Sequence, residues 1–142
     1  MEDVVRRVLE NHRTWAVIGC SPSPSRDSHR IAAMLQRRGY RVIPVNPECG
    51  DELLGVRCYP SLGEAVEAEG PVDVVDIFRR SAEAGRHVDE AIAAGAAAVW
   101  MQLGVIDEGA AARARDAGLD VVMDRCPAIE MPRLGITGPR AV

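Results

Sequence analysis

The chain has 142 residues, of which 47% are hydrophobic and 27% charged, and a net charge of −4. This length predicts one domain over residues 1–142, with its core at about 14–134. The negative charge argues against nucleic acid as the main partner. No apolar run approaches the roughly 20 residues that span a bilayer, so a membrane partner is not expected either.

Four cysteines occur, at Cys20, Cys49, Cys58 and Cys126, and no two of them have CxxC spacing. A zinc site or a thioredoxin-like motif is therefore not indicated. The charged opening MEDVVRRVLENHRT is typical of an amphipathic helix rather than a secretory signal. We therefore expect a cytoplasmic protein with reduced, free thiols.

Along the chain, apolar runs of strand length alternate with helical patterns. Strands are predicted at 15–19, 41–46, 72–78, 97–103 and 120–124, with a minor strand at 55–59. Helices are predicted at about 28–38, 61–69, 81–94 and 107–117. Ser61 followed by Glu64 forms a capping box, and Gly39, Gly95 and Gly118 follow three of the helices.

Strand and helix alternation of this kind predicts the α/β class. The strands show no polar alternation, which indicates helices on both faces of a parallel sheet. We expect a single Rossmann-like, doubly wound parallel sheet of about five main strands. The expected order is roughly 3-2-1-4-5, with an extra edge strand near Val56, and the tail at 131–142 is expected to be irregular.

Polar and special residues gather after the strands, where an open parallel sheet binds its ligands. The first of these loops has one glycine, Gly19, followed by serines, prolines and Arg26. It lacks the GxGxxG of a dinucleotide site, but its side-chain donors and the following helix N-terminus suit a phosphate. The alternative is that the serines and prolines only form a turn and a helix cap.

Other strand ends add to this pattern. The second strand ends at Asn46-Pro47, without the acidic residue that holds the ribose in NAD sites, although an Asn-Pro turn alone would look the same. Arg79 and Arg80 suit phosphate pairing, or else salt bridges to acids such as Glu83.

Catalytic signatures are missing from the sequence: there is no GxSxG, no P-loop and no lysine. Cys126 is either a reactive thiol at the ligand edge or a small buried residue. No metal ligands are predicted, and the chain is not expected to be catalytic on its own.

These residues resemble the bacterial CoA-binding domain family. The resemblance rests on five motifs in order over residues 14–134, namely GCSPSPSRDSHR, GYRVIPVNP, VVDIFR, WMQLGV and VMDRCP. Stand-alone members of this family are similar to the N-terminal domain of the succinyl-CoA synthetase alpha subunit. The synthetase's phospho-histidine domain and the lysine after its second strand have no counterpart here, so its reaction is not expected to carry over.

The resemblance implies that coenzyme A or an acyl-CoA lies across the carboxyl ends of the strands. The Gly19 loop and Arg26 would then hold phosphates, Asn46-Pro47 would border the adenosine, and the later loops would flank the adenine or pantetheine. The cofactor-binding residues expected in this way are Gly19, Cys20, Ser21, Arg26, Ser28, His29, Asn46, Pro47, Phe78, Arg79, Gln102, Gly104 and Cys126.

Three functions are compatible with this sequence. The first is a non-catalytic module that binds the small nucleotide ligand as a sensor, carrier or subunit, as a homo-oligomer or with a protein partner. The second is the CoA-binding subunit of an acyl-CoA ligase that a partner chain completes. The third is an NAD(P)-binding redox protein, which the missing GxGxxG disfavours.

Overall fold

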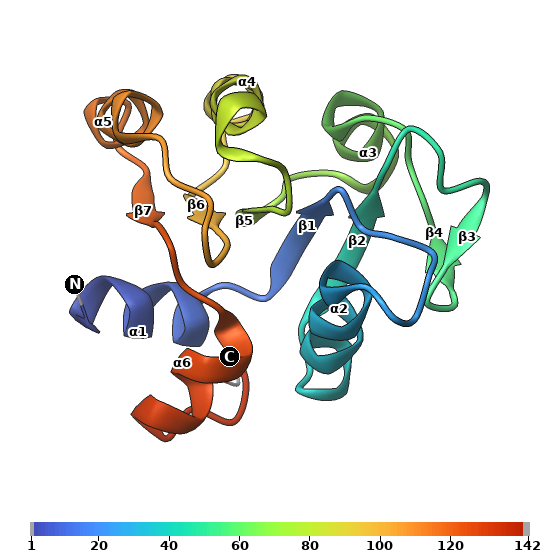
Figure 1. Ribbon diagram of the computed structural model, residues 1–142, viewed down its shortest axis with the longest axis horizontal. Helices are drawn as coiled ribbons and strands as arrows, with labels where there is room; N and C mark the ends of the chain where they lie inside the picture. The colour runs from blue at the N-terminus through green and yellow to red at the C-terminus, as the bar shows by residue number, and fades with distance from the viewer. Residues whose placement is uncertain (1, 141–142) are drawn as a thin grey trace.

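A computed structural model describes residues 2–140 of the chain (Figure 1). Its centre is a five-stranded, fully parallel sheet in the order β2-β1-β5-β6-β7. The strands are β1 (Thr14–Ile18), β2 (Arg41–Val45), β5 (Val74–Ile77), β6 (Ala98–Met101) and β7 (Asp120–Val122). The predicted α/β class and the parallel, Rossmann-like sheet are confirmed.

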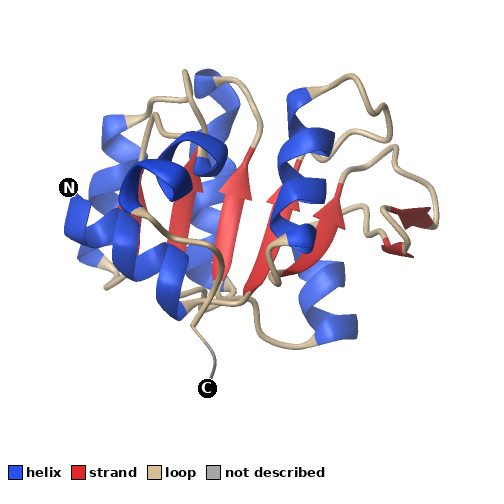
Figure 2. Cartoon of the chain, turned by 90° about the horizontal axis from the view of Figure 1, so that it is seen from below, coloured by secondary structure: helices blue, strands red, loops and turns tan. Residues whose placement is uncertain are grey.

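Helices cover both faces of this sheet (Figures 1 and 2). One face carries α1 (Glu2–Asn11), α2 (Asp27–Arg37) and α6 (Pro127–Leu134), and the other carries α3 (Leu62–Glu69), α4 (Ser81–Ala93) and α5 (Glu108–Asp116). The helix starts follow local chemistry. Ser61 caps α3 by accepting a hydrogen bond from the Glu64 N–H at 3.2 Å, and Asp107 caps α5 through the Ala110 N–H at 3.0 Å.

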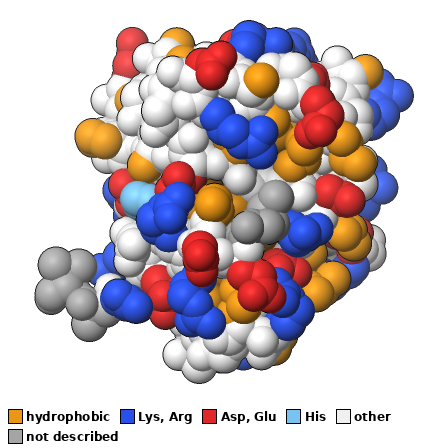
Figure 3. Space-filling view, turned by 90° about the vertical axis from the view of Figure 1, so that its left-hand side faces the viewer, with side chains coloured by type: hydrophobic (Ala, Val, Ile, Leu, Met, Phe, Trp, Pro, Cys, Tyr) orange, Lys and Arg blue, Asp and Glu red, His pale blue; other side chains and the backbone are white. Residues whose placement is uncertain are grey.

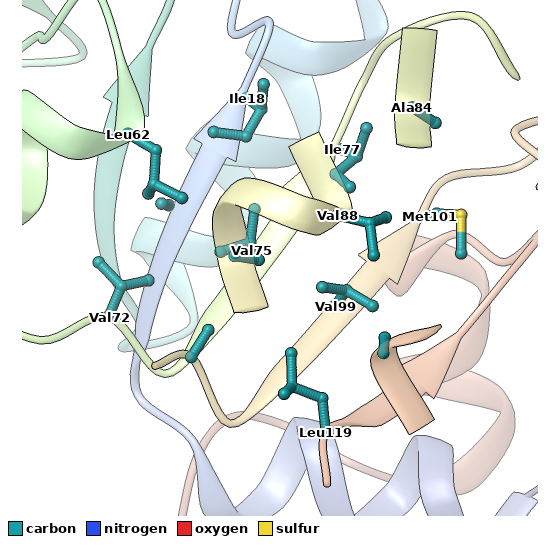
Figure 4. Packing of buried hydrophobic residues seen from close by; sticks show 14 of the residues in the cluster. Ile18, Leu62, Val72, Val75, Ile77, Ala84, Val88, Val99, Met101 and Leu119 are labelled. Carbon is teal, nitrogen blue, oxygen red and sulfur yellow. The ribbon is translucent and has the colours of Figure 1, made fainter. Parts of the chain in front are cut away.

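Two hydrophobic clusters hold the layers together, one on each face of the sheet. Figure 4 shows the first, in which Val75, Ile77 and Val99 of the sheet lie beside Val88 of α4. The second includes Trp15, which contacts the rings of both Tyr40 and Trp100 at 5.5 Å between centroids. Because both faces are buried, the strands need the continuous apolar runs seen in the sequence.

The predicted strand order is wrong at the third main strand. Counted along the chain, the five main strands lie in the order 2-1-3-4-5, because β5 pairs with β1 instead of lying outside β2. Outside β2, Tyr59 forms an isolated parallel bridge with Val45. The segment near Val56 is not a strand of the main sheet but forms a separate hairpin of β3 (Glu52–Leu53) and β4 (Val56–Arg57).

The expectation of an irregular tail is also wrong in its first part. Residues 131–134 belong to α6, whose first residue, Pro127, needs no backbone N–H at that position. Met131 and Ile136 are buried in the second hydrophobic cluster, which fixes the segment against the fold despite Pro132 within the helix. The last two positions of the predicted tail, 141–142, lie outside the described residues.

Cys49 and Cys58 form a disulfide, so the expectation of four free thiols is wrong for this pair. The two Cα atoms lie 6.4 Å apart, within the usual range for a bridge. The bridge closes the segment that contains the β3–β4 hairpin and follows Asn46-Pro47. Cys20 and Cys126 are free, as expected.

Charges on the surface are mixed. Figure 3 shows acidic and basic side chains interspersed on the face that is at the left in Figure 1. Several are paired: Arg7 of α1, for example, binds both carboxylate oxygens of Asp120 at 2.9 and 2.7 Å. Within residues 2–140, no helix is long and apolar enough to cross a membrane.

Candidate functional site

A cavity of about 1210 Å³ lies at the carboxyl ends of the strands, between the loops that follow β1, β2, β5 and β6 and the start of α6. It is lined by all but two of the residues predicted from the sequence, namely Gly19, Ser21, Arg26, Ser28, Asn46, Pro47, Phe78, Arg79, Gln102, Gly104 and Cys126. Cys20 and His29 do not line it. The fold therefore brings together side chains that are up to about a hundred positions apart in the sequence.

Gly19 makes the close approach of two loops possible at the end of β1. Its φ of +82° lies in the left-handed region that glycine adopts without strain. A Cβ atom there would lie 2.5 Å from the carbonyl oxygen of Phe78 and 3.3 Å from Nε of Arg79. A larger residue would push the loop after β5 away, so this glycine brings Arg79 against the first loop.

Two residues of the first turn of α2 fix the serine-rich loop. The buried Ser28 hydroxyl accepts a hydrogen bond from the Ser21 N–H at 2.9 Å, and Nδ1 of His29 donates to the Ser21 carbonyl oxygen at 2.9 Å. His29 thus holds the loop from behind rather than facing the cavity. The first N–H groups of α2 have no intrahelical partner, which makes this end of the cavity attractive to an anion.

Asn46 joins the ends of β1 and β2. Its Nδ2 donates to the carbonyl oxygen of Cys20 at 3.0 Å, while its Oδ1 accepts from the Glu48 N–H at 3.0 Å. The side chain is therefore used in shaping the cavity wall, a role that the sequence alone did not suggest.

Four arginines line the cavity, and they differ in their partners. Arg30 pairs with Asp27, and Nε of Arg80 pairs with Glu83 at 3.1 Å, so the salt-bridge alternative holds for Arg80. Among residues 2–140, no carboxylate lies within 4.0 Å of Arg26 or Arg79. Nε of Arg79 is buried without a hydrogen-bond partner there. These two guanidinium groups are the ones free to pair with an anionic ligand.

Gln102 lines the cavity and is hydrogen-bonded to an acidic residue buried in the sheet. Asp76 of β5 is fully buried, and its Oδ1 accepts a hydrogen bond from Nε2 of Gln102. Burial raises the pKa of Asp76 to about 8, and the Gln102 hydrogen bond opposes that rise. Asp76 was not among the predicted residues, but an acid inside the apolar run VDVVDIF is a signal that could have found it.

The two free thiols have different environments. Cys20 is fully buried, and burial, with the negative charge of Asp76 as a second cause, raises the pKa of its thiol to about 12. Cys20 was expected in the site and instead packs in the second hydrophobic cluster. Cys126 is half-buried, lines the cavity and caps α6; burial raises the pKa of its thiol, and backbone hydrogen bonds from Ala128 and Ile129 oppose the rise.

Apolar side chains complete the lining, and some of them were missed. Ile31 lies one helical turn after Ser28 on α2, and Ala128 lies in the first turn of α6. Leu103 is 61% exposed at the lip, although it is a large apolar residue. The cavity lining thus combines arginines with apolar side chains, which suits a ligand that has both phosphates and an uncharged arm.

A second cavity of about 580 Å³ shares Asn46 and Pro47 with the first. Its charged lining residues are Asp51, Glu64, Glu67 and Arg57, so its balance is acidic. An anionic ligand is therefore favoured in the larger cavity. Within the described part of the chain, no three His, Cys, Asp or Glu side chains gather as a metal site.

Comparison with known proteins gives a family for this chain. Residues 13–132 match the family described as CoA binding domain. The chain belongs to this family. The resemblance predicted from the five sequence motifs is thereby confirmed.

Relatives of this CoA-binding-domain chain are found among curated proteins and solved structures. It is 37% identical over 122 residues to the uncharacterized protein YneT of Bacillus subtilis (strain 168), covering 86% of this chain and 87% of YneT. A hypothetical protein from Pyrococcus horikoshii OT3 has a similar structure, with a TM-score of 0.85, 35% identity and coverage of 94% and 92% of the two chains.

A larger protein contains a similar part. The dinucleotide forming acetyl-coenzyme A synthetase 1 of Ca. Korarchaeum cryptofilum matches with a TM-score of 0.69 and 26% identity. The match covers 84% of this chain but 28% of the synthetase chain. This chain therefore resembles one part of that protein.

Proposed function

We propose that the chain binds coenzyme A or an acyl-CoA in the cavity at the carboxyl ends of the strands, as a non-catalytic sensor, carrier or subunit. The observation that carries this proposal is the pair Arg26 and Arg79, which face the cavity without a carboxylate partner among residues 2–140. They line the cavity together with the first residues of α2. Phosphate groups are the natural partners of such guanidinium groups.

Cavity shape and family membership support the same ligand. Coenzyme A joins an adenosine diphosphate carrying a 3′-phosphate to a long, uncharged pantetheine arm. Such an arm needs apolar contacts and a few hydrogen bonds, and the wall that includes Ile31, Leu103, Val105 and Ala128 offers the apolar contacts. The family itself is described as a CoA binding domain.

Isothermal titration with CoA, acetyl-CoA and NAD tests the proposal. CoA or acetyl-CoA is expected to bind and to raise the melting temperature, since a ligand at a hundredfold excess over Kd stabilises the fold by about 2.7 kcal/mol. NAD is expected to have no effect, because the loop after β1 lacks the glycines that let a pyrophosphate approach. Binding of NAD with no binding of CoA or acetyl-CoA at millimolar concentration would overturn the proposal.

The second candidate is a CoA-binding subunit of an acyl-CoA ligase. It is favoured by the similarity to part of the Ca. Korarchaeum cryptofilum acetyl-coenzyme A synthetase. Affinity purification of the tagged chain from its native host discriminates the two: co-purification of an ATP-binding protein, with ATP-dependent acyl-CoA formation by the mixture, supports the subunit. A chain that purifies alone with bound CoA supports the sensor or carrier. The single-domain organisation and the cytoplasmic location stay predictions.

A further inference from the structure

The Cys49–Cys58 disulfide lies next to the proposed CoA site. Asn46, Pro47 and Glu48 line the main cavity and directly precede Cys49 in the chain. The bridge closes off the β3–β4 hairpin, which lies at the edge of the sheet outside β2 (Figure 1). A bond that thiols can break and re-form therefore lies one residue from the cavity wall.

Residues 46–49, here called the wall turn, are tied to the fold at both ends. At the first end, the Asn46 N–H donates to the Tyr59 carbonyl oxygen at 2.9 Å, and its side chain donates to the Cys20 carbonyl oxygen at 3.0 Å. At the second end, the Cys49 N–H donates back to the Asn46 carbonyl oxygen at 3.2 Å, which is a contact within the turn. The covalent bond to Cys58 ties this second end to another segment of the fold.

Cys58 is held on the main sheet by the residue that follows it. Tyr59 forms the parallel bridge with Val45, and its N–H donates to the Pro44 carbonyl oxygen at 3.1 Å. The disulfide thus joins the second end of the wall turn to the outer edge of β2. In the disulfide form, both ends of this part of the cavity wall are fixed beside the same strand.

The chain after Cys49 has room to move once the bond is broken. Gly50 has a φ of +77°, and a Cβ atom there would meet no atom within 4 Å. The hairpin beyond it has anchors of its own, because Leu53 is buried in the second hydrophobic cluster and the Leu54 carbonyl oxygen accepts from Nε2 of Gln36 at 3.1 Å. Reduction is therefore expected to loosen residues 47–50 and to leave the hairpin in place.

The second cavity gives access to the bridge. Cys58 lines that cavity, and neither cysteine is fully enclosed, since Cys49 is 8% and Cys58 4% exposed. Reduction by a dithiol breaks the S–S bond, leaves a thiol on each cysteine and converts the dithiol to its own disulfide, and a small-molecule disulfide reverses the exchange. In the cytoplasmic location that the sequence predicts, a bridge of this kind is typical of redox sensing.

We propose that the Cys49–Cys58 pair is a redox switch of CoA affinity, with high affinity in the disulfide form and low affinity in the dithiol form. This proposal rests on the CoA site proposed above. In the disulfide form the wall turn is ordered before the ligand arrives, whereas in the dithiol form binding has to order it. Ordering the backbone of one residue corresponds to about a five- to thirtyfold loss of affinity. By linkage, a bound ligand makes the bridge harder to reduce by the same factor.

The test measures the Kd for acetyl-CoA by isothermal titration, with oxidised protein and with protein that has been reduced by a phosphine and desalted without oxygen. Acetyl-CoA is used because it has no free thiol to exchange with the bridge. Cys20 and Cys126 are free thiols already, so reduction acts on the Cys49–Cys58 pair. The Kd is expected to rise about five- to thirtyfold on reduction and to return on reoxidation. Amide hydrogen exchange at 48–50 is expected to quicken on reduction, while that of β1 stays unchanged.

Two variants separate the switch from a general loss of stability. Cys49→Ser/Cys58→Ser is expected to have the affinity of the reduced protein with or without the phosphine. Val88→Ala is the matched control, because Val88 is fully buried on α4 and does not line the cavity. It is expected to destabilise the fold while keeping the wild-type Kd and the wild-type response to reduction.

The outcomes separate this inference from the proposed function. Oxidised wild-type protein that binds neither CoA nor acetyl-CoA overturns the proposed function and the switch with it. Intact binding with equal Kd values for the oxidised and reduced protein overturns the switch alone. A loss of affinity in Val88→Ala as large as that in Cys49→Ser/Cys58→Ser also overturns it, because affinity then follows stability. Circular dichroism that shows an unfolded reduced protein overturns it as well, because the bridge then supports the whole fold.

Discussion

The Nδ2 atom of Asn46, at the end of β2, donates a hydrogen bond to the carbonyl oxygen of Cys20, 3.0 Å away at the end of β1. The same side chain accepts from the Glu48 N–H. One amide thus sets the separation of the first two walls of the cavity. Since Gly19 N–H also donates to the Val45 carbonyl oxygen at 2.8 Å, the two strand ends form one hydrogen-bonded unit.

Asn46→Ala is expected to lower the free energy of unfolding by about 1–3 kcal/mol, because two backbone groups lose a partner and one lies in a part-buried contact. It is also expected to weaken CoA binding. Urea denaturation and titration measure the two effects. Asn11→Ala is the control, because Asn11 is exposed at the end of α1. Equally small changes in unfolding free energy and in CoA affinity for both variants would contradict the role assigned to Asn46.

Arg26→Gln and Arg79→Gln are each expected to weaken CoA binding about 10- to 150-fold, the value of one charge-assisted hydrogen bond. The melting temperature of Arg26→Gln is expected to change little, because Arg26 is exposed. Arg115→Gln on α5 is the control, because it is exposed and does not line the cavity. Unchanged affinity in Arg26→Gln would remove that residue from the site.

Sequence patterns predicted what depends on local chemistry. The Ser61 capping box is confirmed in the structure, and so are the alternating strands and helices, because caps and apolar periodicity act over a few residues. The gathering of loops at the carboxyl edge also followed from the strand pattern, since parallel strands end at the same edge.

Sequence patterns did not predict the contacts between segments that are distant in the chain. Whether β5 lies beside β1 or outside β2 depends on pairing between distant strands, which no local pattern specifies. The same holds for the pairing of Cys49 with Cys58 and for the inward position of Cys20. Helix α6 was missed because Pro132 lies inside it, and burial rather than propensity holds it in place.

Reduction of the Cys49–Cys58 disulfide is expected to lower the free energy of unfolding by roughly 2.5 kcal/mol, the loop-closure value for a short loop. Urea denaturation with and without a thiol reductant measures this difference. The double variant Cys49→Ser/Cys58→Ser is expected to match the reduced wild type and to show no response to the reductant. A response of equal size in that variant would assign the effect to something other than this bridge.

The stability of the fold is expected to depend on pH through Asp76. Its pKa is raised to about 8 in the folded state, so between about pH 4 and pH 8 the folded chain holds a proton that the unfolded chain has released. The free energy of unfolding should therefore fall as the pH rises from about 4 to 8, by up to about 1.4 kcal/mol per unit from this group. Asp76→Asn is expected to flatten that slope. Parallel slopes for the two proteins in urea titrations at each pH would contradict the assignment.

Cys126 is expected to be the thiol that reacts in the folded protein, and CoA is expected to protect it. It lines the cavity and is half-buried, whereas Cys20 is fully buried with a thiol pKa raised to about 12. Because the thiolate is the reactive form, iodoacetamide should label Cys126 far faster than Cys20, although burial raises the pKa of Cys126 as well. Peptide mass spectrometry after a time course measures both rates, with Cys126→Ser as the control.

Bound CoA should slow the labelling of Cys126 by covering the cavity. Incubation with CoA disulfide should give a mixed disulfide at Cys126 and none at Cys20. Labelling of Cys20 at the same rate would contradict the reactivity assigned to the two thiols. Labelling of Cys126 that saturating CoA leaves unchanged would place the ligand away from the start of α6.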